Sequence, residues 1–208
     1  GGSGANRYLN VIGASDYLYR PDSNDAVIEF RRGSYGLTSF GYFSGGSWSD
    51  EQVEVVDMGL RRIHDETGNT RLLKLSDHSR MKFVHKGHLL PGTGDPAVGG
   101  WNYRNVIYLH HGTFGDTENV NDVLNAQQNV IHEIGHNWDT AAENATINEF
   151  RALSGWSADG TEHRADPDTD FARAYGATNA IEDFATCFAA HFMDSDYAEF
   201  IDVDGTRI

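Results

Sequence analysis

The chain of 208 residues contains one cysteine, Cys187. A single thiol cannot form a disulfide within the chain. Cys187 also lies among phenylalanines, at positions 184, 188 and 192, where a buried apolar thiol is more usual than a nucleophile. We therefore expect neither an internal disulfide nor thiol-dependent catalysis.

Basic residues and long apolar runs are also scarce. Lys and Arg number 16 against 31 Asp and Glu, which leaves a net charge of −15. Such a surface repels phosphates, so we expect no nucleic-acid partner, and it suits an extracellular setting. We expect a secreted or extracellular protein of bacterial origin. No run of 18 apolar residues and no signal-peptide-like start is present, so we expect no membrane span. The composition does not indicate which oligomeric state the protein adopts.

The residues that carry chemistry are His132, Glu133 and His136, which form an HExxH pattern. On a helix, positions i and i+4 share a face, so the two imidazoles can bind one zinc ion. Zinc lowers the pKa of a bound water to about 7, and a carboxylate must then take its proton. Glu133 is the one residue of the motif able to do so, because both histidines have committed their lone pairs to the metal. The alternative is a chance spacing in a chain with 10 histidines.

The surrounding pattern predicts a helix from Asn119 to about Asp139, with Asp116 or Thr117 as its N-cap. The two histidines fall beside its apolar stripe, and Gly135 would let another element approach the backbone. The stripe consists of Val120, Val123, Leu124, Ile131, Ile134 and Trp138.

A third zinc ligand must come from elsewhere in the chain. The metzincin pattern requires Gly at 139 and His at 142, where this chain has Asp139 and Ala142. The aspartate-liganded pattern would require Asp at 172, where the chain has Ala172. A glutamate on a second helix remains, and Glu182 supplies it beside an apolar stripe of Ile181, Phe184, Phe188 and Phe192.

Two alternatives to this assignment stay open. Glu182 could instead be a helix-capping glutamate paired with Asn179. His163, in a polar stretch, is the next candidate for the third ligand. Asp139 could orient a ligand histidine through its second ring nitrogen, or could be a solvated residue near the helix end.

The segment from Tyr175-Gly176 to Glu182-Asp183-Phe184-Ala185, together with HExxH, resembles the gluzincin peptidases related to anthrax lethal factor and the Pro-Pro endopeptidases. In that family a tyrosine precedes the zinc-binding glutamate by seven positions, as Tyr175 precedes Glu182 here (182 − 175 = 7). The resemblance implies an α+β zincin-like fold, one catalytic Zn²⁺ and a role for Tyr175 in stabilising the oxyanion. The other interpretation of Tyr175 is a packed aromatic residue.

The pattern along the chain predicts a β-rich N-terminal appendage over 1–46 and a peptidase domain over 47–208, with an upper lobe to about 140 and a mainly helical lower lobe. In the upper lobe, Ser49 and Gln52 form a capping box for a helix that reaches about Glu66 and ends at Gly68. Strands are expected at 71–75, 81–85 and 105–110. As in zincins, the strand Val106 to His110 would be the sheet edge that binds an extended peptide, with His110 and His111 lining the cleft or capping the strand.

The function that this predicts is zinc-dependent hydrolysis of peptide bonds in a peptide or protein substrate. His132, His136 and Glu182 would bind the metal, and Glu133 and Tyr175 would be catalytic. The alternative is a non-catalytic zincin-like binding module with a structural zinc, such as an adhesin or toxin accessory domain. Two imperfect Gly- and Asp-rich segments between residues 13 and 27 resemble Ca²⁺-binding repeats, although ordinary acidic turns explain them better because most of the glycines of the repeat are absent.

Overall fold

The computed structural model describes residues 28–68, 73, 81–96, 98–163 and 171–197. The chain divides into two compact units, Gly1–Val130 and Ile131–Ile208. Most of the expected strand at 71–75 and the Gly- and Asp-rich segments at 13–27 lie outside the described residues. Helices and a mixed sheet are both present, as expected for an α+β protein.

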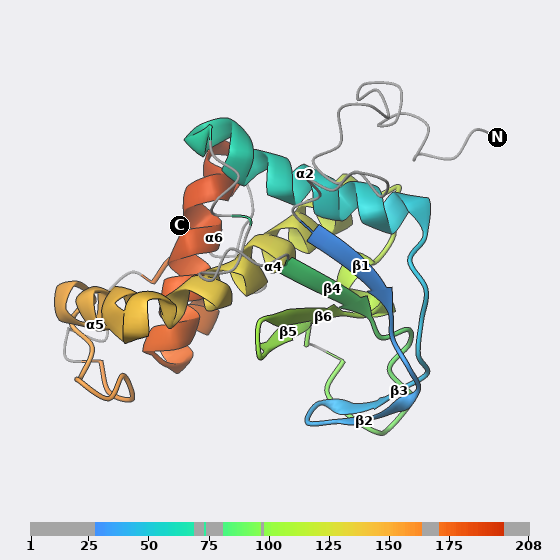
Figure 1. Cartoon of the computed structure of the whole chain (residues 1–208), viewed down its shortest axis with the longest axis horizontal. Coiled ribbons are helices and arrows are strands. Elements are labelled where there is room, and N and C mark those ends of the chain that lie inside the picture. Colours follow the sequence, from blue (N-terminus) through green and yellow to red (C-terminus); the bar gives the residue numbers. More distant parts are fainter. Residues whose placement is uncertain (1–27, 69–72, 74–80, 97, 164–170, 198–208) are drawn as a thin grey trace. The chain divides into compact units, whose positions relative to one another are not determined.

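The first unit contains a four-stranded sheet in the order β1-β4-β6-β5 (Figure 1). Strands β1 (Ile28–Arg32), β4 (Met81–His85) and β6 (Val106–Leu109) are parallel, and β5 (Gly100–Tyr103) is antiparallel to β6. Alternate residues of β4 are buried, beginning with Met81 and Phe83. A short hairpin of β2 (Gly36–Thr38) and β3 (Gly41–Phe43) forms a second sheet.

The position of strand β1 differs from the domain boundaries expected from the sequence. Residues 28–32 were assigned to an N-terminal appendage, yet they pair in register with Met81–His85 of β4. Residues 28–32 are therefore part of the main sheet. The division of the chain also falls after Val130, inside a helix, and not near residue 140.

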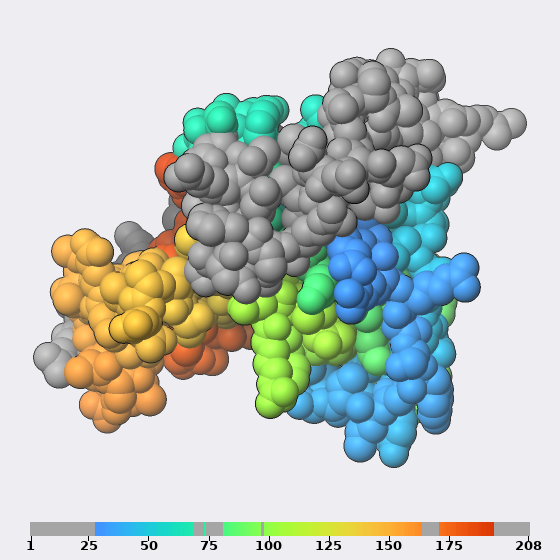
Figure 2. Space-filling view, in the orientation of Figure 1, coloured from blue at the N-terminus to red at the C-terminus, as the bar shows by residue number. Residues whose placement is uncertain are grey.

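The sheet edge is also different from the expected one. The order of strands places β6 between β4 and β5, so β6 is an interior strand and the prediction that it is the edge was wrong. Strand β5 occupies the edge, and Figure 2 shows the β5–β6 hairpin, in light green, at the surface. A two-residue turn at Arg104 and Asn105, with φ of 51° and 62°, joins the two strands. Positive φ at both positions is typical of a type I′ hairpin turn.

Helix α2 (Asp50–Thr67) follows the predicted pattern. The Ser49 side chain accepts a hydrogen bond from the backbone amide of Gln52, and the backbone amide of Ser49 donates one to the Gln52 side-chain oxygen. Gly68 ends the helix with a φ of 61°. Its buried face includes Val56, Leu60 and Ile63. The capping box and the apolar period were enough to define this helix.

Helix α3 (His111–Phe114) is short, and helix α4 (Val120–Asp139) carries the HExxH motif. The N-cap of α4 is Asn119, which accepts a hydrogen bond from the backbone of Asn121, and not Asp116 or Thr117 as predicted. Asp116 instead closes the preceding turn by accepting from the backbone of Glu118. Asp116 and Asn119 are both suited to cap a helix, and the one nearer the apolar stripe, Asn119, takes the position.

The second unit contains the last part of α4, then α5 (Ala141–Ser154), the 3₁₀ helix η3 (Ala174–Thr178) and α6 (Ala180–Tyr197). The 3₁₀ helix includes Tyr175 and Gly176. A cluster of Ile147, Trp156 and Ala180 packs with Phe171 and other aromatic side chains. No helix in the described part of the chain is long and apolar enough to cross a membrane.

Candidate metal centre

The histidines of the HExxH motif lie one turn apart on α4. Their rings are nearly perpendicular, with centroids 4.8 Å apart, and their Nε2 atoms are separated by 3.2 Å. Both side chains are mostly buried, at 11% and 14% exposed for His132 and His136. The helix thus brings two imidazole nitrogens to one point, as the spacing predicts.

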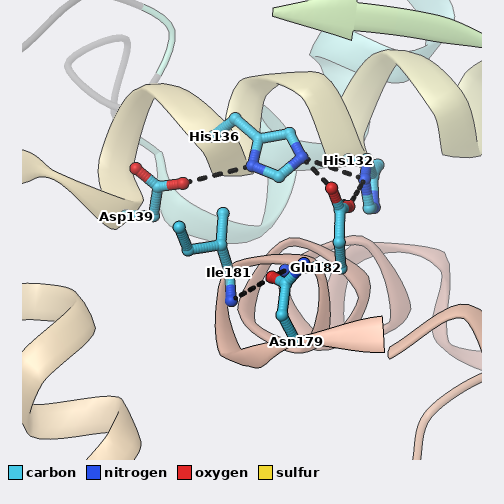
Figure 3. A network of polar contacts seen from close by, with 6 residues as sticks. All are labelled: His132, His136, Asp139, Asn179, Ile181 and Glu182. Atoms are coloured by element: carbon cyan, nitrogen blue, oxygen red, sulfur yellow. Dashed lines mark hydrogen bonds and ion pairs between the residues drawn. The ribbon is translucent and has the colours of Figure 1, made fainter. Parts of the chain in front are cut away.

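Glu182 reaches the same point from α6 (Figure 3). Its Oε2 atom lies 3.1 Å from Nε2 of His132 and 3.3 Å from Nε2 of His136. The cap of α6 is made by Asn179, whose side-chain oxygen accepts hydrogen bonds from the backbones of Ile181 and Glu182. Because Asn179 satisfies these first amides, the Glu182 carboxylate is turned toward the histidines.

The three donor atoms form a triangle with sides of 3.1, 3.2 and 3.3 Å. In a tetrahedral zinc site with metal–ligand bonds of about 2.0 Å, neighbouring donor atoms lie roughly 3.3 Å apart. The triangle therefore has the dimensions of one face of a zinc tetrahedron. Among the described residues, His132, His136 and Glu182 are the group of His, Cys, Asp or Glu side chains close enough to hold a metal ion.

With Glu182 ionised, protons on the two histidines alone do not satisfy this triangle. If both Nε2 atoms carry hydrogen, each donates to Glu182, but two donors then face each other across 3.2 Å. If Nε2 of His132 lacks hydrogen, it can accept from His136, but it then faces a carboxylate oxygen at 3.1 Å. Each arrangement leaves one contact between like partners, whereas a cation bound by all three atoms relieves every one.

Asp139 orients the second histidine. Its Oδ2 atom lies 3.1 Å from Nδ1 of His136, on the far side of the ring from Glu182 (Figure 3). Burial opposes protonation of His136, but the contacts with Asp139 and Glu182 outweigh it and raise the pKa of His136 to about 10. A carboxylate on the second ring nitrogen fixes the imidazole and makes it a more basic ligand.

The other two donors differ from His136 in charge. Burial lowers the pKa of His132, so this imidazole is neutral, the form that binds metal. Burial would raise the pKa of Glu182, but the contacts with His132 and His136 lower it to about 2. A metal ion would therefore meet a carboxylate and one neutral imidazole, and would displace a proton from His136.

Glu133 follows His132 on α4 and is 5% exposed. Burial raises the pKa of Glu133 to about 7, with the charge of His136 lowering it and that of Glu182 raising it. A carboxylate whose pKa lies near neutrality can accept and return a proton at physiological pH. The environment of Glu133 is thus suited to a general base.

Tyr175 on η3 lies beside the histidines. Its ring centroid is 5.9 Å from that of His132, and the residue is 57% exposed. Partial burial and then the charges of Glu182 and Glu133 raise the pKa of Tyr175, so the phenol keeps its proton. A protonated, partly exposed hydroxyl near the three donors can donate a hydrogen bond to a bound molecule.

Gly135 allows α4 and α6 to approach closely enough to build this centre. A Cβ atom at Gly135 would lie 3.1 Å from Cα of Ala185 and 3.3 Å from Cβ of Phe188. The missing side chain therefore permits backbone-to-backbone packing between the two helices, one turn beyond Glu182 on α6.

The other candidate residues lie elsewhere. Nε2 of His163 contacts the carbonyl oxygen of Ser154 at 2.9 Å, and its ring packs against Trp156 and Phe171. His163 is thus engaged in the aromatic cluster and is absent from the donor triangle. His110 caps α3, in the first unit.

Two residues that follow Glu182 on α6, Asp183 and Cys187, also have structural partners. Asp183 accepts a hydrogen bond of 2.8 Å from the indole of Trp156 and one from the thiol of Cys187. Burial, then the charge of Asp183, raises the pKa of Cys187 to about 12, in keeping with an inert thiol. Sequence analysis did not identify Arg173, whose positive charge helps to lower the pKa of His132; its place two residues before Tyr175 was the available signal.

No protein-family model, curated protein or solved structure matches the chain. The resemblance to gluzincin peptidases therefore rests on the motif residues alone.

Proposed function

We propose that this protein is a zinc-dependent endopeptidase of the gluzincin type with a zincin-like fold. The observation that carries the proposal is the donor triangle of His132, His136 and Glu182, whose sides match a zinc tetrahedron. Two imidazoles and one carboxylate are a ligand set typical of catalytic zinc sites, which keep the fourth position open. Structural zinc sites more often have four protein ligands, usually including cysteines.

The chain's own residues then have distinct roles. Bound zinc would supply Lewis-acid chemistry, by polarising the carbonyl and making the attacking water more acidic. Glu133 accepts the proton of that water and later donates it to the leaving amine. Tyr175 donates a hydrogen bond to the developing oxyanion, and Asp139 holds His136 in its metal-binding orientation.

The buried Glu133 favours catalysis over a purely structural metal. Isolating a carboxylate from water is costly, and here it raises the pKa of Glu133 to about 7. A structural site has no use for such a base, whereas a peptidase requires one beside its metal.

The test is Glu133→Gln, assayed against an unbiased peptide library together with the wild type. We expect the variant to bind zinc like the wild type, because the ligands remain, but to cleave peptides at least about 10³-fold more slowly, because the proton acceptor is lost. Glu149→Gln, an exposed glutamate on α5, is the matched control and should retain activity.

The cleavage rates of the wild type and of Glu133→Gln decide the proposal. Equal cleavage by Glu133→Gln and wild type would remove Glu133 from the mechanism. Full zinc occupancy in a wild type that cleaves nothing in the library would instead support a non-catalytic binding module.

A further inference from the structure

Four histidines lie together in the first unit, apart from the donor triangle. His85 ends β4 and is followed by His88, while His110 and His111 directly follow β6. The two strands are parallel neighbours, so their carboxyl ends meet at the same edge of the sheet. Carboxyl ends of parallel strands are a frequent location for ligand sites.

Two of these histidines have structural roles. Nδ1 of His85 accepts a hydrogen bond from the backbone of Gly87 at 3.1 Å, and its ring packs between Trp48 and Phe114. His110 accepts from the backbone of Gly112 through Nδ1 and contacts the carbonyl oxygen of Val98 through Nε2. Both rings are buried and held, so neither is available to a ligand from solution.

His88 and His111 are different, because both are exposed while their backbones are held side by side. The amide of His88 donates to Oγ of Ser44, and the amide of His111 donates to the carbonyl oxygen of Gly87 at 2.7 Å. Their ring centroids lie 4.1 Å apart, closer than the 4.8 Å between His132 and His136. Within the described part of the chain, no hydrogen bond from either ring nitrogen is observed.

A pocket of about 440 Å³ adjoins this pair. Its wall includes His88, Leu90, Pro91, Pro96, His111 and Gly112. Partial burial, together with the charge of His88, lowers the pKa of His111, which favours the neutral ring. Two neighbouring imidazoles beside an open pocket have room for a bound ion and for further ligands such as water.

We propose that His88 and His111 form a second metal site, which takes a borderline-soft divalent ion such as Zn²⁺, Cu²⁺ or Ni²⁺. Imidazole suits these ions, whereas Mg²⁺ and Ca²⁺ prefer oxygen ligands. Two protein ligands bind more weakly than three, so the second site has a lower affinity than the donor triangle. The remaining coordination positions are open to water or to a carboxylate or imidazole of a molecule in the pocket. This site does not depend on the proposed peptidase activity.

The test is a zinc titration of the full chain by calorimetry, with metal content measured in parallel. The wild type should bind two ions in two affinity classes. His88→Ala, His111→Ala and the milder His88→Gln should each lose the weaker class and keep the tighter one. His64→Ala, which removes a partly exposed histidine from α2, is the matched control and should keep both classes.

A wild type that binds a single ion, retained by the His88→Ala/His111→Ala double variant, would overturn the proposal. So would a weaker class that persists in the His88→Ala/His111→Ala double variant, because the second ion would then lie elsewhere. A wild type that binds a single ion, lost in the double variant, would instead contradict the donor triangle and leave the second site standing, so the failures of the two proposals are distinguishable.

Discussion

Glu182 stands at the third position of α6, where a glutamate commonly folds back to cap the first amides of its own helix. The side chain of Asn179 performs that task here, by accepting from the backbones of residues 181 and 182. The Glu182 carboxylate instead contacts both motif histidines. A helix cap and a candidate metal ligand thus coexist in one turn, which the spacing alone could not show.

Separate alanine substitutions of the two candidates for the third ligand, Glu182 and His163, test this assignment. Glu182→Ala leaves two protein ligands, so we expect zinc to be lost on dialysis against a weak chelator, with affinity reduced at least about 10²-fold. His163→Ala should keep its zinc but unfold more readily, because it removes a ring from between Trp156 and Phe171. Metal analysis after dialysis checks both variants. The reverse order of zinc loss would rule out Glu182 as the ligand.

Tyr175 can be tested by removing only its hydroxyl. If the phenol donates to the oxyanion, Tyr175→Phe should lower kcat by roughly 10²-fold, or about 2.7 kcal/mol, while KM and zinc content change little. The ring and its packing near His132 are retained, so a loss of structure would not explain the result. A kcat within a few-fold of the wild type would show that Tyr175 is a packing residue.

At the scale of elements, the centre depends on the close approach of α4 and α6. Gly135 faces Ala185 and Phe188, and any side chain there would push the helices apart. Glu182 lies on the same helix as Ala185, one turn earlier. A shift of a few tenths of an ångström at this contact would therefore alter the donor triangle.

Gly135→Ala separates packing from helix propensity. Alanine favours a helix over glycine by about 1 kcal/mol, but overpacking costs about 1–3 kcal/mol. We expect lower stability and zinc affinity weaker by about 10-fold. Gly59→Ala in α2 is the matched control, since its Cβ would meet its nearest neighbours at 3.4 Å, an ordinary contact, and it should be neutral or stabilising. Unchanged zinc affinity in Gly135→Ala, measured by chelator competition, would contradict this role.

The elements that sequence predicted well are those with local signals. Helix α2 has a capping box at Ser49 and a glycine at its end, and β4 alternates buried and partly buried residues. Strand β5 was missed because its turn, Arg104-Asn105, lacks the glycine that marks most type I′ hairpins. Without β5, β6 was taken as the sheet edge, an error that no local pattern could correct because strand order depends on long-range pairing.

At the scale of the whole molecule, the division of the chain into two units decides which residues share a unit with the candidate metal centre. His132, His136 and Glu182 all belong to the unit Ile131–Ile208, as do Glu133, Asp139 and Tyr175. The sheet and the proposed second site belong to the other unit. The sequence analysis found the motif residues but placed the boundary near residue 140, because the helix predicted from Asn119 to about Asp139 has no local sign of a division at Val130. The boundary is set by long-range contacts, which the local hydrophobic period of a helix does not reveal.

Zinc should therefore stabilise the two units unequally. At a free concentration about 1,000 times the Kd, a ligand that binds only the folded state adds about 4.1 kcal/mol, which slows exchange through unfolding by about 10³-fold. In the His88→Ala/His111→Ala background, where a second ion is excluded, we expect this slowing in the most protected amides of α5 and α6, with β1, β4 and α2 unaffected. Hydrogen exchange with and without zinc measures it, and α4 offers an internal comparison because it crosses the boundary. Equal slowing in both units would contradict this prediction and would mean that the chain unfolds as one cooperative body. Zinc binding slows exchange only in the part of the structure that must unfold for the zinc to be released.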